Sequence, residues 1–218
     1  MQEISRIITP AGDFSLISQY YARMALNLQN SSDPNLDEQI EMFVRWASGD
    51  IAALCNRVFA KETVEDTYLG VSSTGRIYLS HYPIASIASV TEAGSNLVQG
   101  TDYIAEMATG LLRRQPTGIL FAEPVVVTYT GGYVLPYEAP ESLQQASVLL
   151  IREAYYASLR GDATIRMVSH KESRVIYFDP AQQARALMGT AGGAGAGGGT
   201  AAMRSVDALL KKFTRFWV

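Results

Sequence analysis

Few residues of this 218-residue chain have the type and spacing that chemistry requires. The two histidines, His81 and His170, are far apart in sequence, and each lies in a region that we expect to be strand or turn. Without partners nearby, each is better interpreted as a surface or hydrogen-bonded histidine than as a ligand or catalyst. Ser142 and Ser147 have no histidine and carboxylate in a recognisable context, and the sequence has no nucleophile elbow.

Nucleotide-binding and metal-binding signatures are also missing from the sequence. The glycines from Gly192 to Gly199 lack the preceding strand and the Lys-Ser/Thr pair of a phosphate-binding loop. Cys55 is the single cysteine, which excludes an intrachain disulfide and a multi-cysteine metal site. It falls on the apolar side of a predicted helix and is expected to be a small core residue. We therefore expect no enzyme, no cofactor and no metal site.

The charge balance does not favour nucleic-acid binding either. The chain has 18 basic and 21 acidic residues and a formal net charge of −3, whereas nucleic-acid binders carry basic patches. Arg113 and Arg114 could touch a phosphate backbone, but a solvated or salt-bridged edge is the interpretation that we favour. Charged residues make up only 18% of the chain, and there are twelve tyrosines. That composition hints at extensive contact surfaces.

The sequence contains no targeting or membrane signal. The first thirty residues lack a basic start followed by an apolar run, so we expect no signal peptide. No apolar run approaches the roughly 20 residues that cross a bilayer. We expect a protein that is made and folded in a reducing cytoplasm.

Two helices are predicted in the first quarter of the chain, after a loose arm over residues 1–12. Asp13 can cap a first helix that runs to about Asn30, with apolar residues at helical spacing. The second begins at Asp33 as the cap with Pro34 in the first turn. It has a continuous apolar stripe over about six turns, made of Leu36, Ile40, Phe43, Val44, Ala47, Ile51, Leu54, Cys55 and Val58.

Between residues 62 and 133 the apolar period changes from helix to strand. Short runs rich in β-branched and aromatic residues alternate with turn sequences such as Ala93-Gly94-Ser95-Asn96. We predict an antiparallel β-rich insert here. Neither flank has a linker, so residues 1–188 are expected to form a single α+β domain, a helical bundle with this insert.

A third helix follows the last strand of the insert. The double glycine Gly131-Gly132 ends the strand, and Pro136 and Pro140 lead into a helix from Glu141 to Arg160. This helix is apolar on most of its circumference, so it must be buried on several sides. Two alternatives remain open: a central core helix, or a helix that packs against other subunits.

The end of the chain combines a flexible linker with an amphipathic helix. A small hairpin around His170-Lys171-Glu172 and a short helix ending near Met188 precede a Gly-rich linker, residues 189–202. Residues 203–218 form the expected docking helix. Three alternatives remain open for it: docking on a neighbour or different protein, docking back on its own subunit, or lying on a membrane surface. Docking on another protein is favoured because a contact within the same subunit would not need a long flexible linker.

The order of several motifs resembles the head–tail connector (head-completion adaptor) proteins of tailed bacteriophages. The residues that carry the resemblance are CNRVF (55–59), LSHYPIASIASVTEAGSNLVQGTDYIAE (79–106), GLLRR (110–114), VVVTYTGGYV (125–134) and the helix from Pro140 to Arg160. The likeness covers roughly residues 33–178. These motifs are structural, and their specificity comes from their order.

What the resemblance implies is a structural virion protein at the head–tail interface. Its expected form is a homo-oligomeric ring of twelve subunits between the portal and the stopper or tail-completion protein, through which DNA passes without sequence-specific binding. We expect the C-terminal helix to bind the portal, so that deleting residues 203–218 would abolish attachment and leave the fold intact. A monomeric binding module with the helix as a latch is the alternative. The residues expected at the portal contact are Leu209, Leu210, Lys211, Lys212, Phe213, Arg215, Phe216 and Trp217.

Overall fold

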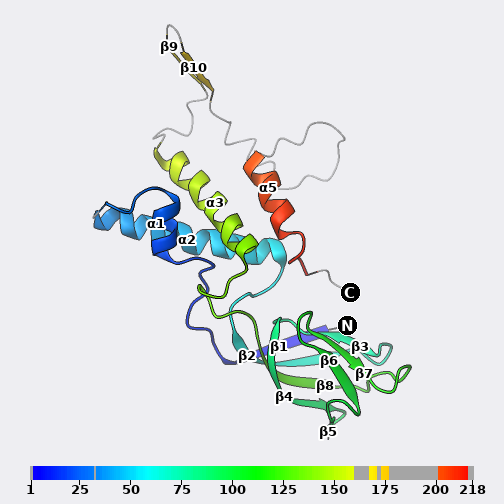
Figure 1. Ribbon diagram of the computed structural model, residues 1–218. Helices are drawn as coiled ribbons and strands as arrows, with labels where there is room; N and C mark the ends of the chain where they lie inside the picture. The colour runs from blue at the N-terminus through cyan, green and yellow to red at the C-terminus, as the bar shows by residue number, and fades with distance from the viewer. Residues whose placement is uncertain (1, 32, 160–166, 171–172, 177–200, 216–218) are drawn as a thin grey trace, which may run out of the picture.

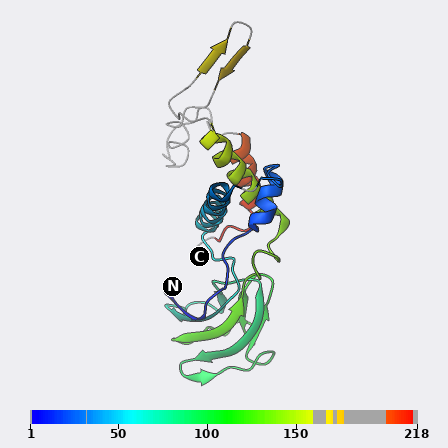
Figure 2. The same ribbon diagram turned by 90° about the vertical axis from the view of Figure 1, so that its left-hand side faces the viewer.

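The computed structural model describes residues 2–31, 33–159, 167–170, 173–176 and 201–215. Helices gather at one end of the molecule and strands at the other, and the chain passes between these ends several times (Figure 1). The view from the side shows the same separation (Figure 2). Each end has its own hydrophobic core. The predicted α+β class is therefore confirmed.

The loose arm predicted at the N-terminus is wrong, because these residues form a strand. β1 (Gln2–Thr9) pairs antiparallel with β2 (Glu62–Leu69), from Gln2 opposite Leu69 to Thr9 opposite Thr63. The run contains three isoleucines, which suit a pleated strand. No pattern in the sequence near β1 indicates its pairing with β2, in which Ser5 lies opposite Asp66.

The first helix is shorter than predicted. α1 (Gln19–Ala25) is capped by Ser18, whose hydroxyl accepts a 3.2 Å hydrogen bond from the backbone N–H of Tyr21. Asp13 instead accepts from the N–H of Ser15 at 2.8 Å. The non-helical residues before α1 bring Leu16 and Ile17 into the core. Some of the apolar residues that predicted a longer helix therefore lie in the loop before α1 and reach the core from there.

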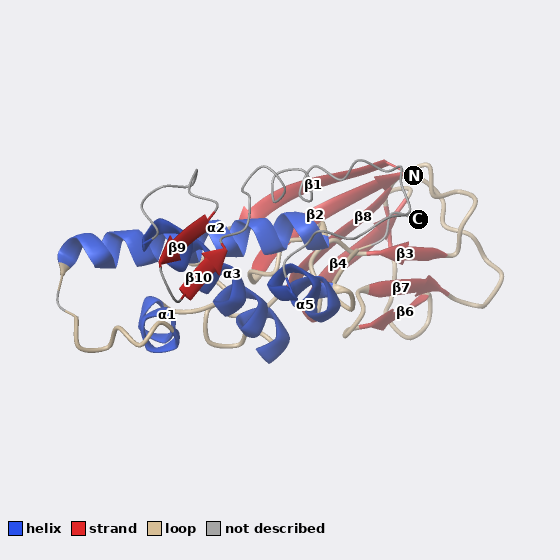
Figure 3. Ribbon diagram, turned by 90° about the horizontal axis from the view of Figure 1, so that it is seen from above, coloured by secondary structure: helices blue, strands red, loops and turns tan. Residues whose placement is uncertain are grey.

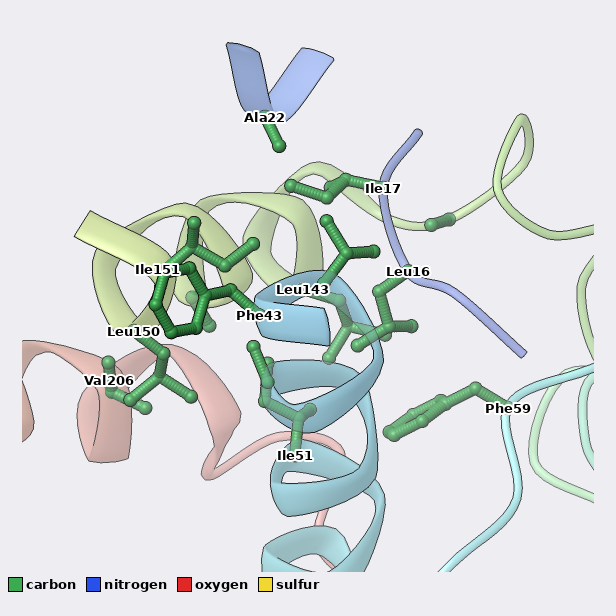
Figure 4. Close-up of a cluster of buried hydrophobic side chains, with 14 of the residues drawn as sticks. Leu16, Ile17, Ala22, Phe43, Ile51, Phe59, Leu143, Leu150, Ile151 and Val206 are labelled. Atoms are coloured by element: carbon green, nitrogen blue, oxygen red, sulfur yellow. The ribbon is translucent and has the colours of Figure 1, made fainter. Parts of the chain in front are cut away.

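The second and third helices match their predictions closely. α2 (Pro34–Cys55) is capped by Asp33, which accepts from the N–H of Asn35 at 3.0 Å, and it buries Cys55 completely. α3 (Glu141–Leu159) packs against α1, α2 and α5 of its own chain. Figure 4 shows Leu143, Leu150 and Ile151 of α3 beside Phe43 and Ile51 of α2. Of the two alternatives for the third helix, the central core helix is the one found.

The β-rich insert, together with β1, forms two antiparallel sheets with a shared core between them. Side chains from both sheets, among them Tyr68, Leu112 and Val127, are fully buried there. Figure 3 shows the two sheets side by side. The larger has the order β1-β2-β8-β4-β5 and the smaller β3-β7-β6, with β3 (Arg76–Tyr78), β4 (Ile84–Glu92), β5 (Ser95–Asn96), β6 (Tyr103–Glu106), β7 (Leu111–Arg114) and β8 (Val125–Gly131).

The predicted double glycine is required where β8 ends. A Cβ on Gly131 would lie 2.2 Å from the carbonyl oxygen of His81, and one on Gly132 would lie 2.3 Å from that of Ala60. Gly132 also has a φ of +103°, which side-chain-bearing residues rarely adopt. The end of β8 can therefore lie close to His81 on one side and to the chain that leaves α2 on the other only because both positions lack a side chain.

The last part of the chain is described in pieces. β9 (Met167–His170) and β10 (Ser173–Ile176) pair antiparallel, which confirms the predicted hairpin. α5 (Ala201–Leu210) starts two residues before the predicted boundary. The predicted short helix before Met188 and most of the Gly-rich linker lie outside the described residues. The division into a domain at 1–188, a linker at 189–202 and a docking helix at 203–218 stays a prediction.

Candidate functional site

The C-terminal segment, defined here as residues 201–215, packs against its own subunit. Val206, Leu210 and Phe213 are 2%, 3% and 8% exposed, and they belong to the helical core. α5 contacts α3 and, less extensively, α2. Among the three alternatives for this helix, docking on its own subunit is the one that the structure shows. The apolar side of α5 packs against α3 and covers the helical core there.

The predicted partner-binding residues fall into three groups. Leu210 and Phe213 are buried, and Leu209 is half-buried against the same core. Lys211 and Lys212 are exposed, and Arg215 is half-buried. Phe216 and Trp217 lie outside the described residues. Because the buried members stabilise this chain's own core, the expectation that deleting residues 203–218 leaves the fold intact does not agree with the structure.

After α5 the segment crosses from the helical core toward the β1 strand. The Phe213 ring meets the Phe59 ring edge-on, with centroids 6.1 Å apart. The backbone N–H of Arg215 donates to the carbonyl of Cys55 at 2.8 Å, and its guanidinium donates to Glu3 Oε2 at 2.7 Å. The segment therefore joins the end of α2 to the first strand of the sheet.

Arg57 links the two cores from the inside. Its guanidinium carbon lies 3.5 Å from the Tyr82 ring centroid and 4.7 Å from that of Phe59, and the group donates to the Tyr82 carbonyl. Burial lowers the pKa of Arg57, while the Tyr82 contact opposes that change. A cavity of about 490 Å³ lies beside it, lined by Arg57, Tyr78, Tyr82, Ala108, Thr109, Tyr133 and residues 212–215. The C-terminal segment thus forms one wall of a cavity at the junction.

A buried carboxylate organises the adjoining end of the β core. Asp66 accepts hydrogen bonds from the hydroxyls of Ser5 (2.6 Å), Ser80 (2.8 Å), Tyr129 (2.6 Å) and Tyr68 (3.2 Å). Burial, followed by the Asp66 charge, raises the pKa of both tyrosines. Both therefore remain neutral donors, and the carboxylate ties β1 to the interior of the sheet.

His81 extends this network without forming a catalytic triad. Its Nδ1 lies 2.8 Å from Ser80 Oγ and its Nε2 lies 3.1 Å from Glu62 Oε2. The Ser-His-carboxylate order is that of a hydrolase, but Ser80 is 9% exposed and its hydroxyl is already shared with Asp66 and Tyr129. A nucleophile needs a substrate within reach and a free trajectory. The network is structural, and the prediction of a hydrogen-bonded histidine is confirmed.

Sequence reasoning missed three polar residues: Arg57, at the junction of the two ends, Glu3, which binds the C-terminal segment, and Asp66, which ties β1 to the sheet. A signal was available for Asp66 and Glu62. Both occupy the positions of β2 that alternate inward with Val64 and Tyr68, where an unpaired carboxylate would be costly. Arg57 falls inside the CNRVF motif, two residues before the buried Phe59.

The structure also bears on Arg114, on metal sites and on membrane-spanning helices. Arg114 pairs with Glu92 at 3.0 Å, which confirms the salt-bridged edge for that arginine. Among the residues that the structure describes, no three His, Cys, Asp or Glu side chains gather closely enough to hold a metal ion. Within the same part of the chain, no helix combines the length and apolar character needed to cross a membrane.

Comparison with known proteins settles the family. A family model described as "Head completion protein" matches residues 18–161, about two thirds of the chain. The chain belongs to the head completion protein family. No curated protein matches it. The resemblance to head-completion proteins predicted from the sequence is therefore confirmed.

Solved structures share the fold of this head completion protein over nearly its whole length. The neck of an empty GTA particle, computed with C6 symmetry, has a chain that is 14% identical with a TM-score of 0.57. A chain in the virion of a native gene transfer agent (GTA) particle gives 14% and 0.56, and one in the neck of a native GTA particle, computed with C12 symmetry, gives 14% and 0.52. Each match covers 99% of this chain and 97% of the other.

Proposed function

We propose that this head completion protein forms a ring adaptor between the capsid portal and the stopper or tail proteins, and that the ring extends the DNA channel. The observation that carries the proposal is the shared fold with a neck chain across 99% of this chain and 97% of the other. Those neck structures were computed with C6 and C12 symmetry. We propose twelve copies, because a ring of twelve identical subunits has C12 symmetry and therefore also C6 symmetry.

A net charge of −3 suits a channel through which DNA slides. Each Lys or Arg contact with a phosphate releases counterions and strengthens binding, so a strongly basic lumen would hold the DNA. Electron microscopy of the protein mixed with its portal protein tests the adaptor role. We expect a second ring stacked on the portal ring, on one side only. Portal rings that stay bare at saturating protein would contradict the proposal.

We further propose that the C-terminal segment contacts the portal through its exposed side. Leu210 and Phe213 hold the segment on its own subunit, and Leu209 packs partly beside them. The exposed Lys211 and Lys212 form the proposed contact, with Phe216 and Trp217 beyond the segment and the half-buried Arg215, paired with Glu3, beside them. This arrangement presents the segment as a fixed surface of the subunit.

Charge reversal tests this contact while keeping the buried side chains Val206, Leu210 and Phe213 in place. Lys211→Glu with Lys212→Glu changes two exposed side chains and is expected to weaken portal binding at least tenfold at low salt. Lys61→Glu, an exposed lysine beside β2, is the matched control and should bind like the unaltered protein. Equal binding by all three proteins would contradict the portal contact.

The latch alternative is favoured by one observation, the docking of α5 on its own subunit. In that case the protein would be a monomer and the segment would open to admit a partner. The two functions differ in oligomeric state, so the same mixing experiment separates them.

A further inference from the structure

The cavity at the junction of the two ends has a positively charged wall. Its volume of about 490 Å³ lies within the range of roughly 300–1,000 Å³ that ligand sites occupy. Three basic residues line it, Arg57, Lys212 and Arg215, and no Asp or Glu is among the described residues of its wall. Glu3 pairs with Arg215 at 2.7 Å, which leaves Arg57 and Lys212 without a carboxylate there.

Arg57 is the most buried of these three cations. It is only 7% exposed, and a guanidinium buried to this degree is normally paired with a carboxylate. Within the described chain Arg57 has no such pair. Its one hydrogen bond there goes to the Tyr82 carbonyl, and its Nε donor has no partner. Because a guanidinium has five N–H donors, most of its hydrogen-bonding capacity is unused.

The ring contacts of Arg57 hold the group in place without neutralising it. The guanidinium carbon lies 3.5 Å from the Tyr82 ring centroid and 4.7 Å from that of Phe59. Cation–π contacts offset only part of the cost of removing a cation from water. The side chain is therefore positioned at the cavity but lacks a counter-charge, as expected of a residue that binds an anion.

The cavity suits a carboxylate at the end of a flexible side chain. A guanidinium fork binds the two oxygens of a carboxylate in a planar, bidentate arrangement. Tyr82 and Tyr133, both half-buried in the wall, offer aromatic surface to the apolar stem of an Asp or Glu. A phosphate of duplex DNA is fixed to a wide and rigid surface, so it cannot follow the cavity to a side chain as buried as Arg57.

We propose that this cavity receives an Asp or Glu side chain of the portal protein, and that Arg57 binds its carboxylate. Lys212 belongs both to the wall of the cavity and to the proposed portal contact. Because Lys212 is exposed, it attracts the acidic side chain at the mouth, and Arg57 holds it inside. This inference rests on the proposed portal contact and adds the chemical group that is recognised there.

Removing the guanidinium tests the site in the full-length protein. Arg57→Met keeps an unbranched side chain and should weaken binding to the portal protein at least tenfold at low salt, because the portal carboxylate would be buried without a counter-charge. Arg113→Met is the matched control. Arg113 is exposed on β7 and does not line the cavity, so this variant should bind like the unaltered protein.

A second variant fills the cavity and leaves Arg57 in place. Ala108 is an exposed residue of the wall, and Ala108→Glu puts a carboxylate beside the basic residues. Portal binding should again weaken at least tenfold. Ala53→Glu adds the same charge at an exposed position of α2 and should not change binding. Thermal unfolding of the free variants shows whether each one folds, and if Arg57→Met does not fold, Ala108→Glu decides alone.

Pairs of substitutions identify the portal carboxylate. Each exposed Asp or Glu of the portal protein is changed to Asn or Gln in turn. We expect one change to weaken binding of the unaltered protein at least tenfold but to weaken binding of the Arg57→Met variant less than twofold, because that pair is already broken. If Arg57 only supported the fold, its substitution would give additive losses with every portal variant.

The outcomes separate this inference from the proposed function. Unchanged portal binding by Ala108→Glu or by a folded Arg57→Met variant overturns the carboxylate site and leaves the contact through Lys211 and Lys212 standing. Additive losses with every portal variant overturn it too. So does a loss of ring formation without portal protein, which would assign the carboxylate to a neighbouring copy. Failure of the unaltered protein to bind the portal protein overturns both the contact and the site.

Discussion

The two cores of this protein are built from different amounts of sequence. All members of the β core fall between Val64 and Tyr129, inside the insert. The helical core draws on residues from Leu16 to Phe213, almost the whole chain. One core is local and the other is closed only when the C-terminal segment returns to α3. The stability of the helical end should therefore depend on residues that the β end does not need.

Removing the C-terminal segment should have the largest effect. Deletion of residues 201–218 takes Val206, Leu210 and Phe213 out of the helical core. Each large side chain removed from a core costs about 2–5 kcal/mol, so the helical end should lose its protection from hydrogen exchange while the β core keeps its own. Unchanged protection of α2 and α3 would contradict the asymmetry.

A single substitution in that segment should act in the same direction with a smaller magnitude. Phe213→Ala removes the edge-on contact with Phe59 and should lower the free energy of unfolding by about 3–5 kcal/mol. Phe14→Ala is the matched control, because Phe14 is 55% exposed, and it should change stability by less than about 0.5 kcal/mol. Urea denaturation measures both, and equal effects would show that burial does not explain the difference.

The β core should respond to a polar change instead. Asp66→Asn replaces a carboxylate that accepts four hydroxyl hydrogen bonds with an amide that has one acceptor oxygen, leaving buried donors unpaired at a cost of about 1–3 kcal/mol. Glu65→Gln, one residue earlier and half-buried on the opposite face, should be near neutral. Hydrogen exchange should place the loss in β2 and β8, and a loss confined to the helices would be inconsistent with two separate cores.

The smallest effect is expected from pH, and it should appear at the helical end. Burial raises the pKa of the Cys55 thiol from 9.0 to about 11, with a smaller opposing effect from Arg57. The unfolded thiol ionises first, so stability from this site is complete below pH 9 and declines as pH rises toward 11. Thiol labelling at pH 8 should be slow in the folded protein and fast in urea. Rapid labelling without denaturant would show that the helical core opens readily.

The sequence allowed the prediction of elements whose signals are local. Asp33 and Pro34 mark the start of α2, and Gly131-Gly132 marks the end of β8. β1 and the docking of α5 were mispredicted because each depends on a partner far away in the chain. Glu3 and Arg215, which bind one another, are 212 residues apart, and no local pattern reports such a contact. Asp66 could have been recognised from its inward position in β2.

We propose that this head completion protein acts as a ring of twelve copies at the neck. Native mass spectrometry of the full-length protein, alone and bound to its portal protein, tests it most directly. We predict a mass of twelve 23.7 kDa subunits, either in free solution or gained by the portal ring. A protein that remains at the mass of one subunit and adds nothing to the portal would contradict the account.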